Sequence, residues 1–368
     1  YDYDIHVTFV ETFSNIDFKI KNKIDGYAGV SLSHTNFYRN GNLQNGAFPD
    51  NSLGESEKQK FYNYGLKGGL VYKITGRHLI TLNVMNATKA PVAQNAFTSP
   101  RTRNEIVANL DNLEILSGDI NYIVRYPKIK ARLTGFYTQV NNQTWARSFY
   151  HDEYLTFVNY MMYDMDQLFM GIEAGAEYNV TPSWQVSGAF TTAEYLYNNR
   201  PKAAIVRDNS REVIAEAREI YLQNYKIGGM PQTAGSIGLK YSSPKYWWIS
   251  ANFNYLADIY LDPNPDRRTA EALSGYVETD PQVAQLIDQE KLANGYTINL
   301  SGGKSWRIKK NNSFIRLNVN INNLLNNTSF ITGGFEQLRY DAADIGKFPS
   351  KYGYTFGLNY FAMLTYQF

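Results

Sequence analysis

The sequence lacks cysteine altogether and has only four histidines among its 368 residues. Without cysteine there can be no disulfide scaffold, no thiolate metal site and no cysteine nucleophile. The histidines stand far apart, at positions 6, 34, 78 and 151, and no H-E-x-x-H pattern occurs, which argues against a zinc protease. No run of about 18 apolar residues is present, so the sequence predicts no transmembrane helix.

A surplus of charge of either sign is also missing. Lys and Arg number 36 and Asp and Glu 34, which leaves a net charge of +2 and argues against a nucleic-acid partner. Aromatic residues are abundant, with 30 Tyr, 20 Phe and 5 Trp. This content argues against disorder, and it is typical both of soluble β-proteins and of the aromatic girdles of membrane β-barrels. The length allows two globular domains or one large all-β unit.

The first twenty residues have neither a basic n-region nor a continuous apolar stretch, so they do not form a signal peptide. They have the pattern of a strand already under way, and no initiator Met precedes them. We therefore expect a processed, cleaved or partial chain.

Apolar and polar residues alternate with a period of two along much of the chain. In 314–324, Leu317 and Val319 share one face while Arg316, Asn318 and Asn320 share the other. A helix would not separate these sets, because its neighbours lie three and four residues apart. Segments 170–179, 247–259 and 296–305 alternate in the same way. The polar face is rich in Asn, Ser, Thr, Gln and Gly, and the apolar face has aromatics toward the strand ends, as expected between lipid and a wet lumen.

The connections between these strands give a second signal, because short joints alternate strictly with long ones. Outer-membrane barrels have this pattern of short periplasmic turns and long extracellular loops, whereas a soluble sandwich has no reason for it. The short joints are 21–25, 75–77, 126–128, 180–183, 242–245 and 307–313, and the long ones are 39–58, 88–113, 147–163, 199–222, 261–293 and 325–352. We predict strands at 3–20, 26–38, 59–74, 78–87, 114–126, 129–146, 164–179, 184–198, 223–241, 246–260, 294–306, 314–324 and 353–368.

The predicted fold is therefore an all-β, antiparallel transmembrane β-barrel in the bacterial outer membrane, with its C-terminus in the periplasm. Thirteen strands would place the two termini on opposite sides, whereas bacterial single-chain barrels have even strand counts. An open sheet would also leave two unpaired edges in lipid. We expect further strands before Tyr1.

The last strand ends in Phe368 after alternating apolar residues, and this resembles the insertion signal at the C-terminus of outer-membrane barrels. The residues assigned to that signal are Tyr360, Leu364, Tyr366 and Phe368.

Three short motifs resemble one family, the TonB-dependent outer-membrane transporters. They are Asn323-Leu324-Leu325-Asn326 at the exit of the penultimate strand, ATKAPVAQNAF at 87–97, and Gly171-Ile172-Glu173 in a hairpin. Each motif is weak alone, and their order is more specific. The loop and terminal patterns look closer to the SusC-like branch, which works with a surface lipoprotein lid.

The resemblance implies a 22-stranded barrel of which residues 1–368 form the C-terminal portion, about 13 strands. It implies an N-terminal plug and first strands outside this chain, and contact with TonB through the plug. The implied function is active uptake of a nutrient, namely an oligosaccharide, a peptide or a metal chelate, with no enzyme activity, cofactor or metal. A passive porin or fatty-acid channel, and a scaffold barrel in a surface lipoprotein complex, are the alternatives.

The resemblance also assigns roles to residues by their place on strands and loops. Plug-facing candidates, which could equally be solvated wall residues, are Asp119, Arg132, Glu173, Glu177, Arg316 and Asn318. Substrate-binding candidates in the long loops, which could instead pack the loops together, are Trp145, His151, Tyr154, Arg267, Arg268, Phe335, Glu336, Gln337 and Arg339. Two loop segments, 211–223 and 281–292, have the pattern of short helices.

Two further signals are set aside. Gly303-Lys304-Ser305 lacks the preceding glycine of a P-loop and lies at the end of a strand, not at the start of a helix. A lone loop histidine, His151, could ligate haem iron, but such a residue is more often an ordinary polar side chain.

Overall fold

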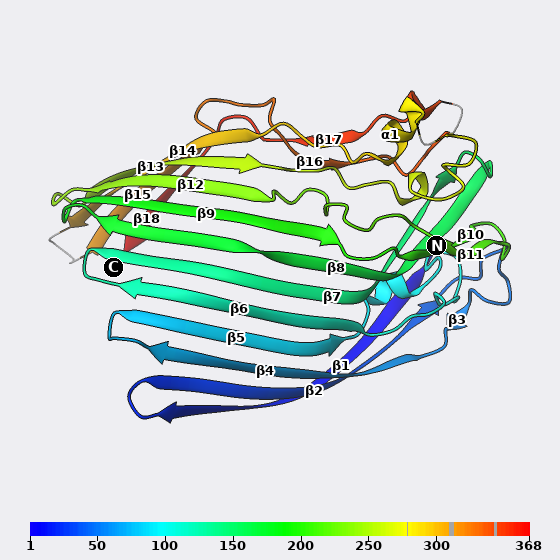
Figure 1. Cartoon of the computed structure of the whole chain (residues 1–368), viewed down its shortest axis with the longest axis horizontal. Coiled ribbons are helices and arrows are strands. Elements are labelled where there is room, and N and C mark those ends of the chain that lie inside the picture. The colour runs from blue at the N-terminus through cyan, green and yellow to red at the C-terminus, as the bar shows by residue number, and fades with distance from the viewer. Residues whose placement is uncertain (278, 309–312, 342–343) are drawn as a thin grey trace.

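One large, curved antiparallel sheet forms most of the molecule (Figure 1). The computed structural model describes residues 1–277, 279–308, 313–341 and 344–368. Within them each strand pairs with the next along the chain, in the order β1 (Tyr3–Ile20), β2 (Ile24–Gly41), β4 (Gln59–Lys73), β5 (His78–Lys89), β6 (Leu113–Arg125), β7 (Ile129–His151), β8 (Thr156–Asn179), β9 (Trp184–Tyr197), β12 (Thr233–Ser242), β13 (Trp247–Ala257), β14 (Gly295–Ile308), β15 (Ser313–Asn322) and β18 (Asn359–Gln367). Every predicted segment contributes one strand to this path.

The sheet is open within the described residues, because β1 and β18 form its two edges and do not pair with each other. The remaining elements lie in the connections. They are the short strands β3 (Gly54–Glu55), β10 (Lys202–Arg207), β11 (Val213–Glu219), β16 (Ile331–Phe335) and β17 (Lys351–Tyr354), the helix α1 (Pro281–Ile287), and the 3-10 turns η1 (Ala93–Ala96), η2 (Pro265–Arg267) and η3 (Ile345–Lys347).

The pairing register sorts the side chains of the main strands into two faces. Directly opposed residues of antiparallel strands point to the same face, so Val319 shares a face with Gly302 and Ala362, while Asn318 shares the other with Gly303 and Met363. We call these the apolar face and the polar face. Large apolar side chains stand exposed along the apolar face from β2 to β18, among them Leu32, Leu70, Leu82, Ile120, Leu133, Ile172, Ile237, Ile249 and Leu364. The predicted alternation is confirmed.

Two ends of the sheet differ in their connections (Figure 1). At the short-turn end, the strands are joined by residues 21–23, 74–77, 126–128, 180–183 and 243–246, and the C-terminus lies here. At the long-loop end lie the extended connections, α1 and the N-terminus. The predicted short joint 307–313 includes residues 309–312, which lie outside the described residues.

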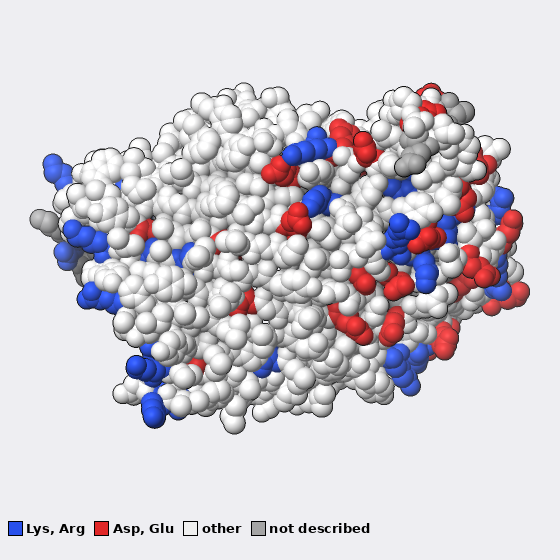
Figure 2. Space-filling view, in the orientation of Figure 1, with Lys and Arg blue, Asp and Glu red and all other residues white. Residues whose placement is uncertain are grey.

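Charged side chains are scarce across the middle of the face in view in Figure 2 and gather at its two ends. Lys and Arg dominate at the short-turn end, whereas Asp and Glu join them in numbers at the long-loop end. On this face the middle of the sheet is therefore nearly uncharged, as a sheet in contact with lipid requires.

Aromatic rings cover glycines on neighbouring strands and so tighten the pairing. A Cβ on Gly69 would lie 2.3 Å from the ring of Tyr27, whose hydroxyl donates a 3.2 Å hydrogen bond to Asn83 Oδ1. On the apolar face, the ring of Phe18 lies over Gly26 in the same way. A side chain at either glycine would overlap the ring that covers it, so both positions require a residue without a Cβ atom.

The Asn-Leu-Leu-Asn motif is a corner that joins β15 to the segment before β18. Asn323 and Asn326 both adopt left-handed φ values, 49° and 52°, which Asn tolerates better than most residues. The buried side chain of Asn323 donates to Asn327 O at 3.0 Å and to Phe356 O at 2.9 Å. Asn326 Oδ1 accepts a 2.8 Å bond from the backbone N–H of Leu358. The motif therefore satisfies backbone groups where the chain leaves the sheet.

The predicted loop 147–163 is wrong. There β7 and β8 continue as a long hairpin that turns only at residues 152–155, beyond a bulge between Val140 and Trp145. Val158, Tyr160 and Met161 are all nearly inaccessible although they lie on both faces of β8. A strand buried on both faces has no alternation to reveal it.

The two predicted loop helices have different outcomes. Segment 281–292 contains α1, which begins after Asp280, whose side chain accepts a 2.9 Å bond from Gln282 N, and ends at Ile287. Segment 211–223 is not helical, because Val213–Glu219 forms β11 and pairs with β10. Pairing with a neighbouring strand overrides helix propensity over so few residues.

Two predicted strands are shorter than expected. Residues 223–232 are irregular, with left-handed Asn224 and Gly229, and the strand starts only at Thr233. Segment 353–368 is broken, because Lys351–Tyr354 pairs with β16 and only Asn359–Gln367 joins the main sheet. No helix within the described residues is long and apolar enough to cross a membrane.

Opposite substitutions on β15 test the two faces. Val319→Arg should lower the free energy of unfolding of the whole protein in lipid vesicles by about 2–4 kcal/mol, because the charge would enter lipid near the midplane. Asn318→Arg, one residue away on the polar face, should cost much less. Urea unfolding in vesicles measures both, and equal losses would contradict the assignment of the faces.

Candidate functional site

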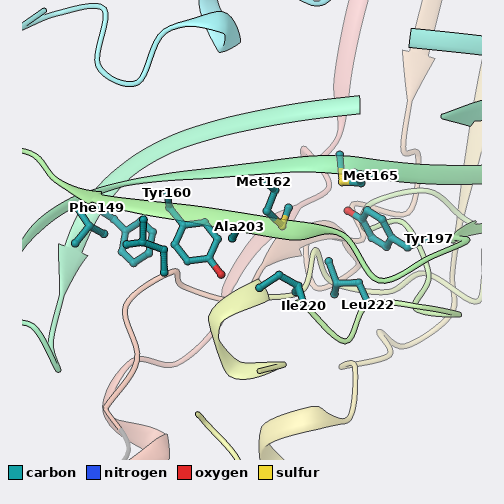
Figure 3. Packing of buried hydrophobic residues seen from close by; sticks show 10 residues of the cluster. Phe149, Tyr160, Met162, Met165, Tyr197, Ala203, Ile220 and Leu222 are labelled. Carbon is teal, nitrogen blue, oxygen red and sulfur yellow. The ribbon is translucent and has the colours of Figure 1, made fainter. Parts of the chain in front are cut away.

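A compact core holds the loops together at the long-loop end. The extended β7–β8 hairpin, β10 and the segment after β11 bury Phe149, Val158, Tyr160, Ile205 and Ile220 against one another (Figure 3). Since β10 pairs with β8 on one side and β11 on the other, these two strands extend the large sheet at its long-loop end. The loops at this end are therefore ordered by a hydrophobic core and by strand pairing, which together position their side chains.

A buried ion pair joins two loops that are far apart in sequence. Arg268 donates from its Nη2 to Glu336 Oε1 at 2.8 Å, and its Nη1 also contacts Glu336 Oε2. The same guanidinium donates to the carbonyl oxygens of Asn264 at 3.1 Å and Asp288 at 3.1 Å. Arg268 is fully buried and Glu336 nearly so. Both predicted substrate-binding residues thus tie loop 258–294 to loop 323–358.

His151 and Tyr154 also take part in contacts between loops. His151 Nε2 lies 2.9 Å from Asp266 Oδ2, and its ring packs against that of Tyr154 at a tilt of 32°, with 4.2 Å between centroids. Arg218 donates to the Tyr154 hydroxyl at 2.7 Å and to Asp266 Oδ1 at 3.3 Å. His151 is 2% exposed, so a ligand cannot reach it without moving the loops.

The other predicted loop residues lie nearer the surface, apart from buried Arg267, whose Nη2 donates to Phe348 O at 3.4 Å. Arg339 makes a two-pronged ion pair with Asp152, at 2.7 and 3.1 Å. Gln337 donates to Pro349 O at 2.8 Å. The contacts of Arg267 and Arg339 again connect one loop to another, whereas that of Gln337 lies within loop 323–358.

A cavity of about 690 Å³ opens among the loops. We call it the mouth cavity. Of the predicted residues, Trp145, Phe335 and Glu336 line it. The rest of its wall comes from the start of β6, the β7–β8 hairpin and five other segments, and includes Asn95, Gln143, Arg147, Gln167, Tyr197, Leu222 and Asp262.

The mouth cavity offers aromatic, amide and charged groups together. Phe335 is 50% exposed, and the Arg147 guanidinium lies 4.9 Å above the half-buried ring of Trp145. The Tyr197 hydroxyl donates to Asp262 Oδ1 at 3.4 Å. Burial raises the pKa of Asp262, and the Tyr197 hydrogen bond and the positive charge of Arg147 oppose this rise. Within the described residues neither Arg147 nor Asp262 has an ion-pair partner closer than 4 Å.

Sequence reasoning missed Arg147, Tyr197 and Asp262. One signal was available for Arg147, since it lies two residues after Trp145 on a strand and so shares its face. Asp262 lies in an irregular loop, and nothing in its neighbours along the chain marks it.

The polar face carries a second cluster, midway along β5, β6 and β7. Asn121 is almost fully buried, donates to Thr81 at 2.8 Å and accepts from Arg132 Nε at 2.8 Å. Asp119 accepts from Asn83 at 2.9 Å. Two predicted plug-facing residues, Asp119 and Arg132, are therefore members of one wall network.

The other predicted plug-facing residues lie on the same face by register. Glu173 and Glu177 lie four residues apart on the polar face of β8. In the described part of the chain neither has an ion-pair partner. Arg316 opposes Ser305, and Asn318 opposes Gly303. Their position is compatible with contact to a plug, which stays a prediction.

The predicted insertion residues Tyr360, Leu364, Tyr366 and Phe368 project from the apolar face of β18 and its end, and all are exposed. Gly303-Lys304-Ser305 lies inside β14, paired on both sides, and cannot cradle a phosphate. Among the described residues, no group of three His, Asp or Glu side chains could hold a metal ion.

Removing one partner of the buried ion pair should loosen the loops. Arg268→Ala leaves Glu336 buried without its cation, which typically costs about 3–5 kcal/mol. We expect faster proteolysis within 258–294 of the whole protein while the barrel stays folded on unheated gels. Arg200→Ala is the control, because Arg200 and Glu219 are each 52% exposed and such pairs contribute little. Equal cleavage of the two variants would contradict this role.

Comparison with known proteins gives three findings of different strength. Structures similar to this chain include a copper transporter, OprC (12% identity, TM-score 0.63, covering 99% of this chain and 49% of that one), and the siderophore receptor PiuA from Acinetobacter baumannii (13%, 0.64, 100% and 44%). The unliganded ferric citrate transporter FecA is similar too (11%, 0.59, 100% and 46%). At these identities the likeness shows the fold, and this chain spans less than half the length of each.

No curated protein matches the chain. A family model described as "TonB dependent receptor-like, beta-barrel" matches residues 2–324, most of the sequence. The chain belongs to the TonB-dependent receptor-like β-barrel family.

Proposed function

We propose that this chain is the C-terminal part of an outer-membrane transporter that takes up a nutrient by a TonB-dependent mechanism. The family is one of bacterial outer-membrane β-barrels, and the chain has its fold along nearly its whole length. The observation that carries the proposal is the mouth cavity. It lies among packed loops at one end of a sheet whose outer face is apolar.

The two unpaired edges of the sheet support the proposal that an N-terminal part of the protein closes the barrel. The exposed edges of β1 and β18 carry backbone groups that must be hydrogen-bonded in lipid, where each unpaired group costs several kcal/mol. We propose that preceding strands pair with both edges and close a barrel of 22 strands. A lumen of that width must be plugged, and the plug would be the element that touches TonB.

The proposed orientation puts the long-loop end outside the cell and the C-terminus in the periplasm. Long loops outside and short turns inside are the rule for outer-membrane barrels. The mouth cavity then faces incoming substrate, and the wall network of Asp119 and Arg132 faces the plug. Glu173 and Glu177 would be available to basic side chains of the plug.

The substrate class is an oligosaccharide, a peptide or a metal chelate. The exposed ring of Phe335, the amides of Asn95 and Gln167, and the charges of Arg147 and Asp262 offer stacking, hydrogen bonding and charge pairing in one cavity. A surface lipoprotein lid, as in the SusC-like branch, would cover this end, and copurification of such a protein would support that assignment.

Uptake by cells tests the mechanism. Cells that express the whole protein should accumulate the substrate only when TonB and the proton-motive force are intact. In planar bilayers the purified protein should stay closed. Open conductance without TonB, together with TonB-independent uptake, would instead favour a passive channel.

Substitution within the cavity tests the site. Phe335→Ala should weaken binding of the transported substrate roughly tenfold, because an exposed aromatic ring in a binding pocket often contributes more than 1 kcal/mol. Leu155→Ala is the matched control, since Leu155 is also exposed but lies at the tip of the β7–β8 hairpin. Calorimetry on the whole protein measures both, and unchanged binding by Phe335→Ala would exclude this part of the cavity.

A further inference from the structure

The short-turn end is strongly basic although the whole chain is nearly neutral. Segments 17–25, 73–78, 125–130, 177–185, 240–245, 304–308 and 313–316, which contain short turns and the adjoining strand ends, carry thirteen Lys and Arg but only three Asp and Glu. Since the chain has 36 basic and 34 acidic residues, the rest of the sequence carries 23 and 31. Figure 2 shows the basic side chains at this end of the visible face. The excess of positive charge is therefore local.

Two of these turns are joined by an aromatic cluster at the edge of the apolar face. The Arg77 guanidinium lies 4.9 Å above the ring of Tyr126, and Arg77 O accepts a 2.8 Å bond from Arg125 N. His78 contacts the hydroxyls of Tyr122 at 2.7 Å and Tyr126 at 2.9 Å. The two turns, 74–77 and 126–128, are thus held side by side.

Lys128 stands in the second of these turns, two residues after Tyr126. The turn is closed by a 2.7 Å bond from Tyr126 N to Ile129 O, and Lys128 O accepts a 2.8 Å bond from Asn179 N. Arg77 and Lys128 are both exposed, and within the described residues neither has an ion-pair partner. Two free cations on fixed turns can therefore bind an anion from outside.

An apolar groove of about 490 Å³ starts beside this cluster and crosses the apolar face from β6 to β12. Its floor is formed by small residues, because Ala131, Ala176 and Gly188 oppose one another across β7, β8 and β9. Its rims are larger side chains, Tyr122, Leu133, Phe190 and Ile237. A groove with an apolar floor, on the face that meets lipid, has the shape and chemistry for an acyl chain.

We propose that an anionic phospholipid of the bilayer binds here, with its phosphate between Arg77 and Lys128 and one acyl chain in the groove. The positive charge selects an anionic headgroup, and each basic residue near a membrane surface contributes about 1 kcal/mol to such binding. Tyr122 and Tyr126 lie at the height of the headgroups, as aromatic girdles do. The inference rests on the proposed placement in the outer membrane but not on uptake.

Lipid titration of the whole protein tests the site. The protein in detergent is titrated with phosphatidylglycerol, and with phosphatidylcholine of the same acyl chains, and bound lipid is counted by native mass spectrometry. The wild type should prefer phosphatidylglycerol. Arg77→Gln with Lys128→Gln should lower that affinity about thirtyfold, or roughly fivefold for each cation. Ala176→Leu, which fills the groove, should reduce the occupancy of both lipids.

The control is Lys58→Gln with Lys60→Gln, which removes two cations at the long-loop end and should leave the preference unchanged. Unheated gels confirm that each variant is folded. Equal binding of the two lipids by the wild type would overturn the proposal, as would an equal loss in the control. Substrate uptake is measured separately, so a failed uptake assay with intact lipid preference would contradict only the proposed transport.

Discussion

The need to pair every backbone N–H and C=O in lipid is the constraint on which this structure depends. It commits the chain to long strands in register with their neighbours, and the register then fixes which face each side chain occupies. For this reason Val319 and Asn318, although adjacent in sequence, lie on opposite faces of the sheet, one toward lipid and the other toward the lumen. The Asn323 corner obeys the same constraint, because it supplies side-chain hydrogen bonds where the chain leaves the sheet.

This constraint also explains which parts of the fold could be predicted. Where a strand has lipid on one side and a polar lumen on the other, alternation locates it, and each such segment contributes a strand to the sheet. The hairpin beyond Trp145 has protein on both sides, so Val158, Tyr160 and Met161 are all buried and the signal disappears. β11 was missed because its partner strand, not its own residues, determines its conformation.

The candidate site was less predictable, because it is assembled from segments that only the fold brings together. Trp145 and Phe335 could be chosen by residue type and loop position, and both line the mouth cavity. The same criteria selected His151, Arg267 and Arg268, which are buried between loops. Residue type alone cannot separate these roles, since charged side chains serve equally well to tie loops together and to bind a ligand. Arg147 and Asp262 line one cavity only after β7 and loop 258–294 are placed.

The near-neutral composition conceals a basic short-turn end, which an acidic surplus in the rest of the chain offsets. Positive charge is concentrated at the short turns, and the rest of the chain has more Asp and Glu than Lys and Arg. An apolar band of about 25 Å separates the ends of such a barrel, whereas charges in physiological salt are screened over about 8 Å. The two ends therefore act independently. Each meets its own surroundings, and the net charge of +2 describes neither. The balance between them lets one chain present a basic rim to anionic headgroups and a mixed, more acidic surface at the opposite end.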